Sequence, residues 1–314
     1  MKIKKCIKQP IVVICGPTAS GKTDIAIRLA KLFNGEIIGA DSMQIYRHMD
    51  IGTAKPTQEE LDQVFHHMIN IINPDEPFNA VQYRKKAKDC IRDIHARKKT
   101  PFLVGGTGLY IKALLQGMFK SSEISSEIRT ALRNRLKTEG SAVLYQELKE
   151  KDSDIANRLH PNDSHRIVRA LEIFLATGTT MSKHQAKHSF KTHFYQALKL
   201  GISVPREILY ERINRRVDKM ISEGFLTEVK KLIRLGYNPE LKPMQSIGYR
   251  HIISFLQNEI DEPTMIQQIK QETRRYAKRQ ITWFSADKEI HWISSENMDK
   301  MSQLIKEFLQ EFKN

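Results

Sequence analysis

Residues 16–23 of the chain read Gly16-Pro17-Thr18-Ala19-Ser20-Gly21-Lys22-Thr23, which matches the phosphate-loop pattern G-x-x-x-x-G-K-[ST] at every constrained position. An apolar, β-branched run at residues 11–15 precedes the loop, and an amphipathic helical pattern at residues 22–33 follows it. In a strand, glycine-rich loop and helix of this order, backbone N–H groups surround phosphate oxygens at the positive end of the helix. The stretch therefore predicts a binding site for a di- or triphosphate.

Two side chains of this loop carry specific expectations. Lys22 supplies a positive charge for a terminal phosphate, and the Thr23 hydroxyl is a ligand for Mg²⁺. The pattern does not say what happens to the phosphate. A kinase, an ATPase and a transferase that releases diphosphate all remain open at this point.

The fold follows from further apolar runs at residues 36–40, 101–104 and 198–204, with helical patterns at 22–33 and 81–97 between the first ones. Alternating strands and helices predict an α/β fold with a parallel sheet flanked by helices on both faces, similar to that of P-loop NTPases. Helical patterns at residues 210–235, 249–256 and 263–284 follow the last of these apolar runs.

From residue 117 the strand-like runs disappear and charged helical patterns replace them, for example at 126–139 and 161–177. We therefore predict three parts: a first part of the core at 1–116, an all-helical insertion domain at 117–195, and a second part of the core with C-terminal helices at 196–314. An ordinary charged subdomain and an RNA-binding one are equally compatible with this pattern.

Composition narrows the class of protein. The 314 residues carry a formal net charge of +15, which favours a polyanionic partner such as nucleic acid or an anionic membrane surface. The three cysteines, Cys6, Cys15 and Cys90, contain no Cys-x-x-Cys pair, which argues against a disulfide framework and a zinc site. The apolar run near the N-terminus is too short for a secretory signal, and no run is long enough to span a membrane. We expect a cytoplasmic protein.

Two more predicted strand ends carry polar residues. Asp41 follows the second run and Thr107 follows the third, inside Gly105-Gly106-Thr107-Gly108. The carboxyl ends of parallel strands face the substrate crevice, so both side chains are candidates for the site. Asp41 could bind an acceptor or the metal, or take a proton; a turn or helix cap is an equal alternative for it. For Thr107 the alternative is a tight glycine turn.

Seven blocks of the sequence, from residue 16 to residue 284, resemble the tRNA dimethylallyltransferase (isopentenylpyrophosphate transferase) family of bacteria, in family order. These blocks are GPTASGKT, DSMQIYRHMDIGTAKP, HHMINIINPDEPFNA, VGGTGLYIKALLQG, RIVRALEIF, QSIGYR and TRRYAKRQITWF. The resemblance implies an Mg²⁺-assisted transfer of a dimethylallyl group from dimethylallyl diphosphate to N6 of the adenosine immediately 3′ of the anticodon, with release of diphosphate.

The resemblance also implies roles for particular residues. Asp41 is the general base, Thr107 steadies the diphosphate, and Arg216, with Arg212 as the second choice, binds the donor phosphates. The phosphate loop holds the diphosphate and is also the family's nucleotide-binding (ATP-binding) segment. The residues expected to contact the tRNA anticodon stem-loop are Asp41, Ser42, Met43, Gln44, Thr107, Arg129, His165, Arg166, Ile167, Val168, Arg169, Gln245, Ser246, Ile247, Gly248, Tyr249 and Arg250. We expect a monomer.

Basic residues also recur at helical spacing between residues 270 and 280. Such rows of positive charge can bind the phosphates of an RNA backbone. The alternative is a basic helix face that contacts only solvent. Aromatic residues at helical spacing are more often core than base-stacking surfaces, so we predict Tyr276, Trp283 and Phe284 to be core.

Two departures from the family pattern stand out: His165 replaces a usual Gln, and residues 118–125 lack the usual proline-bearing segment. The chain ends soon after the last block, so we expect no C-terminal zinc finger of the eukaryotic kind. The rival interpretations are an adenylate isopentenyltransferase acting on free AMP, a small-molecule kinase, and a non-catalytic RNA-binding protein. The long insertion and the basic surplus favour an RNA acceptor.

Overall fold

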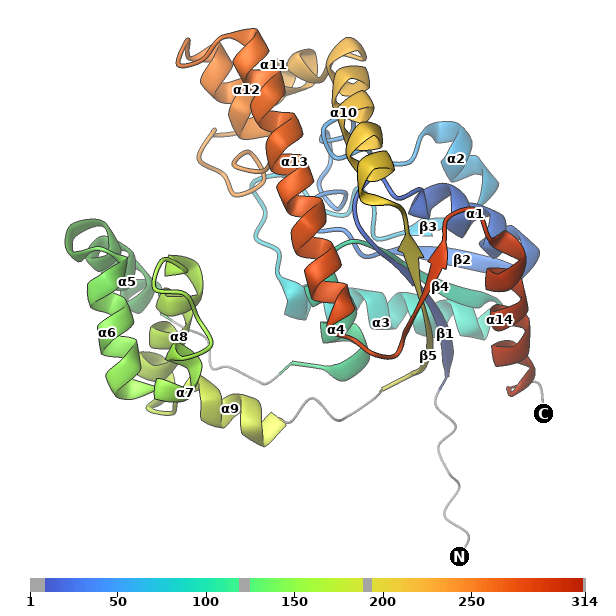
Figure 1. Ribbon diagram of the computed structural model, residues 1–314, viewed down its shortest axis with the longest axis horizontal. Helices are drawn as coiled ribbons and strands as arrows, with labels where there is room; N and C mark the ends of the chain where they lie inside the picture. The colour runs from blue at the N-terminus through green and yellow to red at the C-terminus, as the bar shows by residue number, and fades with distance from the viewer. Residues whose placement is uncertain (1–8, 119–124, 189–193, 313–314) are drawn as a thin grey trace, which may run out of the picture. The chain divides into compact units, whose positions relative to one another are not determined.

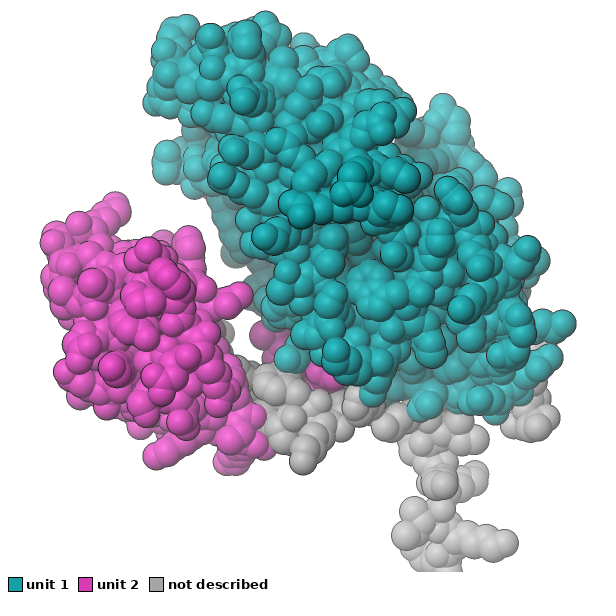
Figure 2. Space-filling model, viewed as in Figure 1, with its two compact units in different colours: residues 1–115, 194–314 teal, residues 116–193 magenta. Residues whose placement is uncertain are grey.

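The computed structural model describes residues 9–118, 125–188 and 194–312. Figure 2 shows its two compact units: one joins Met1–Leu115 to Phe194–Asn314, and the other is Gln116–His193. The smaller unit begins one residue before the predicted insertion domain and ends two residues before it. Cys6, and residues 119–124 of the segment that departs from the family pattern, lie outside the described residues.

A six-stranded parallel sheet forms the centre of the larger unit (Figure 1). The strand order is β3-β2-β4-β1-β5-β6, and every pair of neighbours is parallel. The strands are β1 (Pro10–Cys15), β2 (Gly35–Gly39), β3 (His66–His67), β4 (Thr100–Gly105), β5 (Gln196–Ser203) and β6 (Ile290–Ser294). The predicted α/β fold is confirmed.

Two strands were not predicted. β3 has only two residues, which is too short to give a sequence pattern. β6 is an edge strand in which only Ile290 and Ile293 are buried, so its sequence lacks an apolar run. Both strands depend on pairing with a neighbour that is distant in the sequence.

Helices cover the sheet on both faces. α1 (Lys22–Leu32) and α14 (Met298–Gln310) share one face, where Leu29 and Ile305 pack in a core cluster with Val12 and Leu200 of the strands. Alternate strand residues point to the other face, where α3 (Ala80–Ala96) packs on β2 and β4. The Tyr83 ring of α3 stacks on Tyr110 of α4 (Gly108–Gln116) at 4.1 Å.

Four helices between β5 and β6 pack beside the carboxyl edge of the sheet: α10 (Arg206–Ser222), α11 (Phe225–Arg234), α12 (Tyr249–Leu256) and α13 (Glu262–Ser285). The helical pattern predicted at 210–235 forms two helices, because Gly224 has φ +99° and separates α10 from α11. α13 contacts both α10 and α12 and carries the predicted basic segment.

The smaller unit is all helical, as expected for the insertion. It contains α5 (Ser126–Glu139), α6 (Ser141–Lys151), α7 (Ser153–Ala156), α8 (Ser164–Thr177) and α9 (Met181–His188). Leu132, Leu144 and Leu171 are among the buried residues of its own core. Within the described parts of the chain, none of the helices is both long enough and apolar enough to cross a membrane.

Candidate active site

The predicted site residues of the core meet at the carboxyl edge of the sheet. β1 ends at the phosphate loop, β2 ends just before Asp41, and β4 ends just before Gly106 and Thr107. A cavity of about 850 Å³ lies over these strand ends and is lined by Lys22, Asp41 and Arg216, among others. We call it the first cavity.

The phosphate loop has the backbone that the sequence predicts. Gly16 has φ +145°, and a Cβ there would lie 3.1 Å from the carbonyl oxygen of Ile202, so glycine fits best. Gly21 has φ +87° and directly precedes α1. Because glycine has no side chain to cap the helix, the first N–H groups of α1 are available to an anion.

Two cationic side chains lie close together in the first cavity. Burial and the nearby Arg216 charge lower the pKa of Lys22 to about 8. Burial also lowers the pKa of Arg216, which Asp41 opposes, and Arg216 Nη1 donates to Thr18 Oγ1 at 3.3 Å. Two neighbouring cations with reduced hydration favour the binding of an anion between them. This arrangement fits a diphosphate group.

Asp41 combines two of the roles considered from the sequence. Its Oδ1 accepts hydrogen bonds from the N–H groups of Met43, at 2.8 Å, and Gln44, at 3.3 Å, so the side chain closes its own turn. The residue is partly exposed and lines the first cavity. The hydrogen bonds therefore orient a carboxylate that faces the cavity.

Thr107 lies behind Asp41. Its N–H donates to Ala40 O at 3.0 Å, and its Oγ1 accepts from the Ser42 N–H at 3.0 Å. Gly105 and Gly106, but not Thr107, line the first cavity. In this structure Thr107 therefore contacts the Asp41 segment, and a contact to diphosphate stays a prediction.

A second cavity of about 350 Å³ adjoins the first. Both cavities are lined by Thr18, Asp41, Arg216 and Tyr276. The second cavity is also lined by Ser42 and Met43, by five of the predicted tRNA-contact residues on α12 and the turn before it, and by apolar side chains such as Ile213 and Phe225. Those five residues are Ser246, Ile247, Gly248, Tyr249 and Arg250, of which Tyr249 is buried. Asp41 and Arg216 thus lie at the boundary between the first cavity, which is lined by the phosphate loop, and the more apolar second cavity.

Gln280 of α13 was not recognised from the sequence. It is buried; its Oε1 accepts from the Thr18 N–H at 2.8 Å, and its Nε2 donates to Gly106 O at 3.0 Å. One amide side chain thus connects the phosphate loop to the loop after β4. Its helical spacing placed it among solvated basic residues, and no local signal identifies a contact so distant in the sequence.

The predicted aromatic core was partly wrong. Phe284 is buried, but Tyr276 lines both cavities and Trp283 is 42% exposed. Burial and the charge of Asp41 raise the pKa of Tyr276, so it is neutral at physiological pH. Tyr276 therefore belongs to the site.

The remaining predicted RNA contacts lie in the smaller unit and on the surface. His165 and Arg166 are exposed on α8. Ile167 and Val168 are buried, so the side chains of these two residues pack in the core of the smaller unit. Glu172, 6% exposed, pairs with Arg169 at 2.9 Å and with Arg129 at 3.6 Å. Gln245, on the surface of the larger unit, donates through Nε2 to Pro239 O.

The donor set around the loop fits a metal that is shared with a phosphate ligand. In the parts of the chain that the structure describes, no group of three or more His, Cys, Asp or Glu side chains could hold an ion alone. Mg²⁺ typically takes one or two protein oxygens and completes its shell with phosphate oxygens and water. Thr23 and Asp41, which line the first cavity, provide such oxygens.

Comparisons with protein-family models and with known sequences identify the same family. The family model described as "IPP transferase" matches residues 44–287. A tRNA dimethylallyltransferase 2 from Syntrophus aciditrophicus is 47% identical over 303 residues, which cover 96% of this chain and 97% of the relative. A tRNA dimethylallyltransferase from Desulfosudis oleivorans is 48% identical over 97% of this chain and 98% of its own length.

Solved structures give the same result. The crystal structure of a tRNA isopentenylpyrophosphate transferase from Staphylococcus epidermidis has a TM-score of 0.70 and 39% identity, covering 97% of this chain and all of that chain. A eukaryotic dimethylallyltransferase acting on tRNA has a TM-score of 0.76 and 29% identity, covering 93% of this chain and 75% of that chain.

Proposed function

The chain belongs to the IPP transferase family, and from this premise we propose that it transfers a dimethylallyl group from dimethylallyl diphosphate to N6 of the adenosine immediately 3′ of the anticodon in tRNA. One observation supports this reaction above the alternatives: Asp41 and Arg216 line both the phosphate cavity and the adjoining apolar chamber. A transfer between a diphosphate and a base needs its reacting groups at such a boundary.

In this proposal the first cavity holds the leaving group. The C1–O bond of the donor breaks as negative charge grows on the diphosphate, and positive groups aimed at that charge lower the barrier. The loop N–H groups, Lys22 and Arg216 provide this field, and Arg212 also lines the cavity. Mg²⁺ held at the Thr23 hydroxyl would add further charge to the leaving group.

The second cavity receives the acceptor base. The adenine must leave its stack to enter a closed pocket, which costs a few kcal/mol and less in a loop than in a duplex. As the N6–C1 bond forms, N6 loses a proton, and Asp41 accepts it. A carboxylate in this role contributes about 10²–10⁴-fold to the rate. The apolar lining limits access of water to the reacting allyl group.

tRNA is the macromolecular substrate in this proposal, and the predicted contacts extend to Arg129, His165, Arg166 and Arg169 of the helical unit. We include in the proposal that the protein acts in the cytoplasm and as a monomer. Sedimentation of the purified protein, alone and with tRNA, checks the monomeric state.

The decisive experiment incubates the protein with dimethylallyl diphosphate labelled in the prenyl group, Mg²⁺ and unmodified tRNA, followed by mapping of the labelled nucleoside. Label on the adenosine 3′ of the anticodon supports the proposal. Parallel reactions with AMP and with ATP plus small-molecule acceptors test the two rival enzymes. Label on AMP alone, or phosphate transfer without prenylation, contradicts it.

A further inference from the structure

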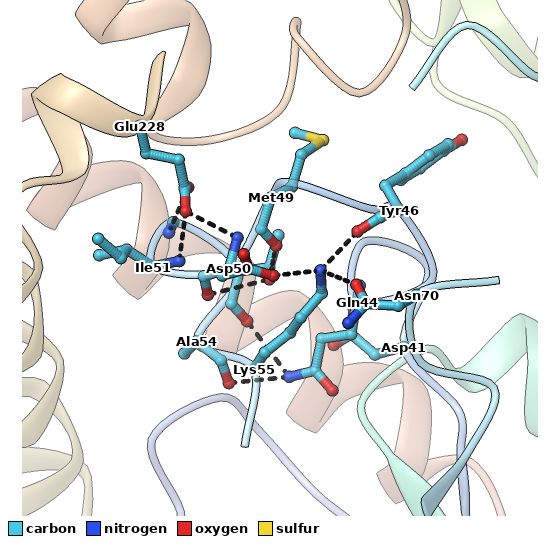
Figure 3. Close-up of polar contacts among 12 residues, drawn as sticks. Asp41, Gln44, Tyr46, Met49, Asp50, Ile51, Ala54, Lys55, Asn70 and Glu228 are labelled. Atoms are coloured by element: carbon cyan, nitrogen blue, oxygen red, sulfur yellow. Dashed lines mark hydrogen bonds and ion pairs between the residues drawn. The ribbon is translucent and has the colours of Figure 1, made fainter. Parts of the chain in front are cut away.

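The loop from residue 41 to residue 56 forms one wall of both cavities. Its first part carries Asp41, and its far part supplies Gly52, Thr53 and Ala54 to the second cavity. Loops longer than about 12–15 residues without secondary structure are uncommon in compact domains. In this loop, two charged side chains provide the support, one from within the loop and one from α11 (Figure 3).

Lys55 is the internal support. Its ammonium group donates to Tyr46 O at 2.5 Å, to Asp50 Oδ1 at 2.6 Å and to Asn70 Oδ1 at 2.5 Å, and its side chain is only 5% exposed. All three protons of the ammonium group therefore have an acceptor. Lys55 closes the loop on itself and fixes it to the segment that contains Asn70.

Glu228 of α11 is the external support. Its Oε2 accepts from the N–H groups of Asp50, at 2.8 Å, and Ile51, at 2.7 Å. Its Oε1 accepts from the Gly52 N–H at 3.1 Å and from the Tyr249 hydroxyl at 2.7 Å. Hydrogen bonds to an ionised acceptor are about twice as strong as neutral ones. One carboxylate therefore holds three successive N–H groups of the loop and one residue of the opposite wall.

The loop also packs closely against two aromatic rings at the same point. A Cβ on Gly52 would lie 2.1 Å from the Phe225 ring and 2.7 Å from that of Tyr249. Phe225 and Tyr249 also line the second cavity. A shift of the loop tip therefore changes the width of this cavity directly.

The loop tip is coupled to Asp41 through Gln44. Gln44 Nε2 donates to Thr53 O at 3.2 Å and to Ala54 O at 3.0 Å, and the Gln44 N–H donates to Asp41 Oδ1. Figure 3 shows Asp41 and Gln44 at one end of this chain of contacts and Glu228 at the other. None of these contacts involves Lys22, Arg216 or the phosphate loop.

From this geometry we propose that Glu228 is a positioning residue: it fixes the loop wall of the second cavity and, through Gln44, the direction of the Asp41 carboxylate. It acts on the acceptor base and the proton transfer, and not on the diphosphate. The inference rests on the proposed function, because its readout is prenyl transfer. Misplacement of reacting groups by about 1 Å lowers rates up to roughly 10²-fold.

The test compares Glu228→Gln with wild type and with Glu211→Gln, whose carboxylate is exposed and pairs with Arg215 on the surface of α10. The glutamine has the same shape but turns an N–H₂ group toward backbone donors. We expect kcat/KM for tRNA to fall about 10–100-fold, while the dissociation constant of inorganic diphosphate, measured by calorimetry, stays within twofold of wild type. Glu211→Gln is expected to match wild type in both.

Tyr249→Phe is the second variant, because it removes one donor to Glu228 and keeps the ring that fills the wall. We expect a smaller loss in kcat/KM for tRNA, again with unchanged diphosphate binding. Glu228→Asp, which keeps the charge, should recover part of the activity lost in Glu228→Gln.

The outcomes distinguish a failure of the proposed function from a failure of the positioning role of Glu228. If the wild-type protein does not prenylate tRNA, the proposed function is wrong. If wild type is active and Glu228→Gln equals it, the positioning role is wrong. A loss of diphosphate affinity in step with the loss of turnover, or no recovery in Glu228→Asp, also overturns the inference, because both indicate general damage to the fold.

Discussion

Lys22 is a residue of the first cavity whose charge state changes with pH just above neutrality. Its pKa is lowered to about 8 by burial and by Arg216, so the free protein loses this charge as pH rises through about 8. A bound anion raises the pKa of Lys22 again, and binding therefore takes up a proton. Above pH 8 the contribution of Lys22 to diphosphate affinity should fall by up to about tenfold per pH unit.

Lys22→Met isolates this effect from the ionisation of diphosphate itself, which affects both proteins equally. We expect the ratio of the variant's dissociation constant to that of wild type to shrink steadily between pH 7 and pH 9.5, measured by calorimetry. A ratio that does not change with pH would show that Lys22 keeps its proton throughout.

Asp41 can be tested without disturbing its turn. In Asp41→Asn the Oδ1 atom still accepts from Met43 and Gln44, but the side chain no longer accepts a proton. We expect kcat to fall by about 10²–10⁴-fold in steady-state prenylation. Diphosphate affinity should stay equal or improve, because a negative charge near Lys22 is removed.

Asp24→Asn is the matched control for this variant. Asp24 also lines the first cavity, but its carboxylate is exposed and faces Arg28 at 3.8 Å. Near-wild-type turnover is expected from it. Retained turnover in Asp41→Asn would remove Asp41 from the role of base.

Among the single residues, the sequence predicted those whose position follows from the neighbouring segments of the chain. The phosphate loop and Asp41 follow predicted strands directly, so their place at the sheet edge follows from chain order. Gln280 and Glu228 were missed because their partners lie 262 and about 177 positions away in the sequence. A sequence pattern within one segment cannot predict contacts with residues so far away along the chain.

Among the elements, α13 connects the predicted RNA surface with the phosphate site. Its exposed face carries Arg275 and Lys278, and its buried face carries Gln280, which bonds to Thr18 and Gly106. In Gln280→Glu the Thr18 N–H keeps an acceptor, but Gly106 O then faces a carboxylate. We expect a stability loss of about 1–3 kcal/mol in thermal or urea unfolding, and weaker diphosphate binding because a negative charge is added beside the loop.

Gln271→Glu on the exposed part of the same helix provides the control, since it adds the same charge away from the loop. Its diphosphate affinity and stability should remain close to wild type. Equal diphosphate affinity in Gln280→Glu and wild type would mean that Gln280 does not support the phosphate loop.

The elements that were predicted well are those with strong internal periodicity, such as α1, α3 and α13. The break between α10 and α11 was missed because Gly224 lies in a continuous amphipathic pattern, and one glycine is tolerated in many helices. β6 was missed because only Ile290 and Ile293 of this edge strand are buried, so its sequence has neither an apolar run nor a strict alternation, and the strand forms by pairing with β5.

For the whole molecule, the helical unit has its own core and connects to the larger unit at one place. The Phe194 N–H donates to Leu115 O at 3.0 Å, so the chain leaves the larger unit and returns to it at adjacent positions. The sequence predicted these boundaries within two residues because strand-like runs stop near residue 117 and resume near residue 196. It did not predict that Glu172 holds Arg129 and Arg169 together.

This connection makes the helical unit removable. We expect a protein in which two or three glycines replace residues 116–193 to fold, because the ends to be joined are already hydrogen-bonded and the main sheet is untouched. It should bind inorganic diphosphate with the affinity of the full chain. Prenylation of tRNA should be lost, since the exposed basic residues of α5 and α8 are removed and each phosphate contact contributes to RNA affinity.

A full-length variant with Arg129, Arg166 and Arg169 changed to alanine tests the same surface without removing the unit. Its KM for tRNA should rise, and the dependence of KM on salt should become less steep, because fewer counterions are released on binding. Turnover on tRNA at the wild-type rate by the shortened protein would show that the acceptor is recognised by the larger unit alone, through the wall formed by Ser246 and Arg250.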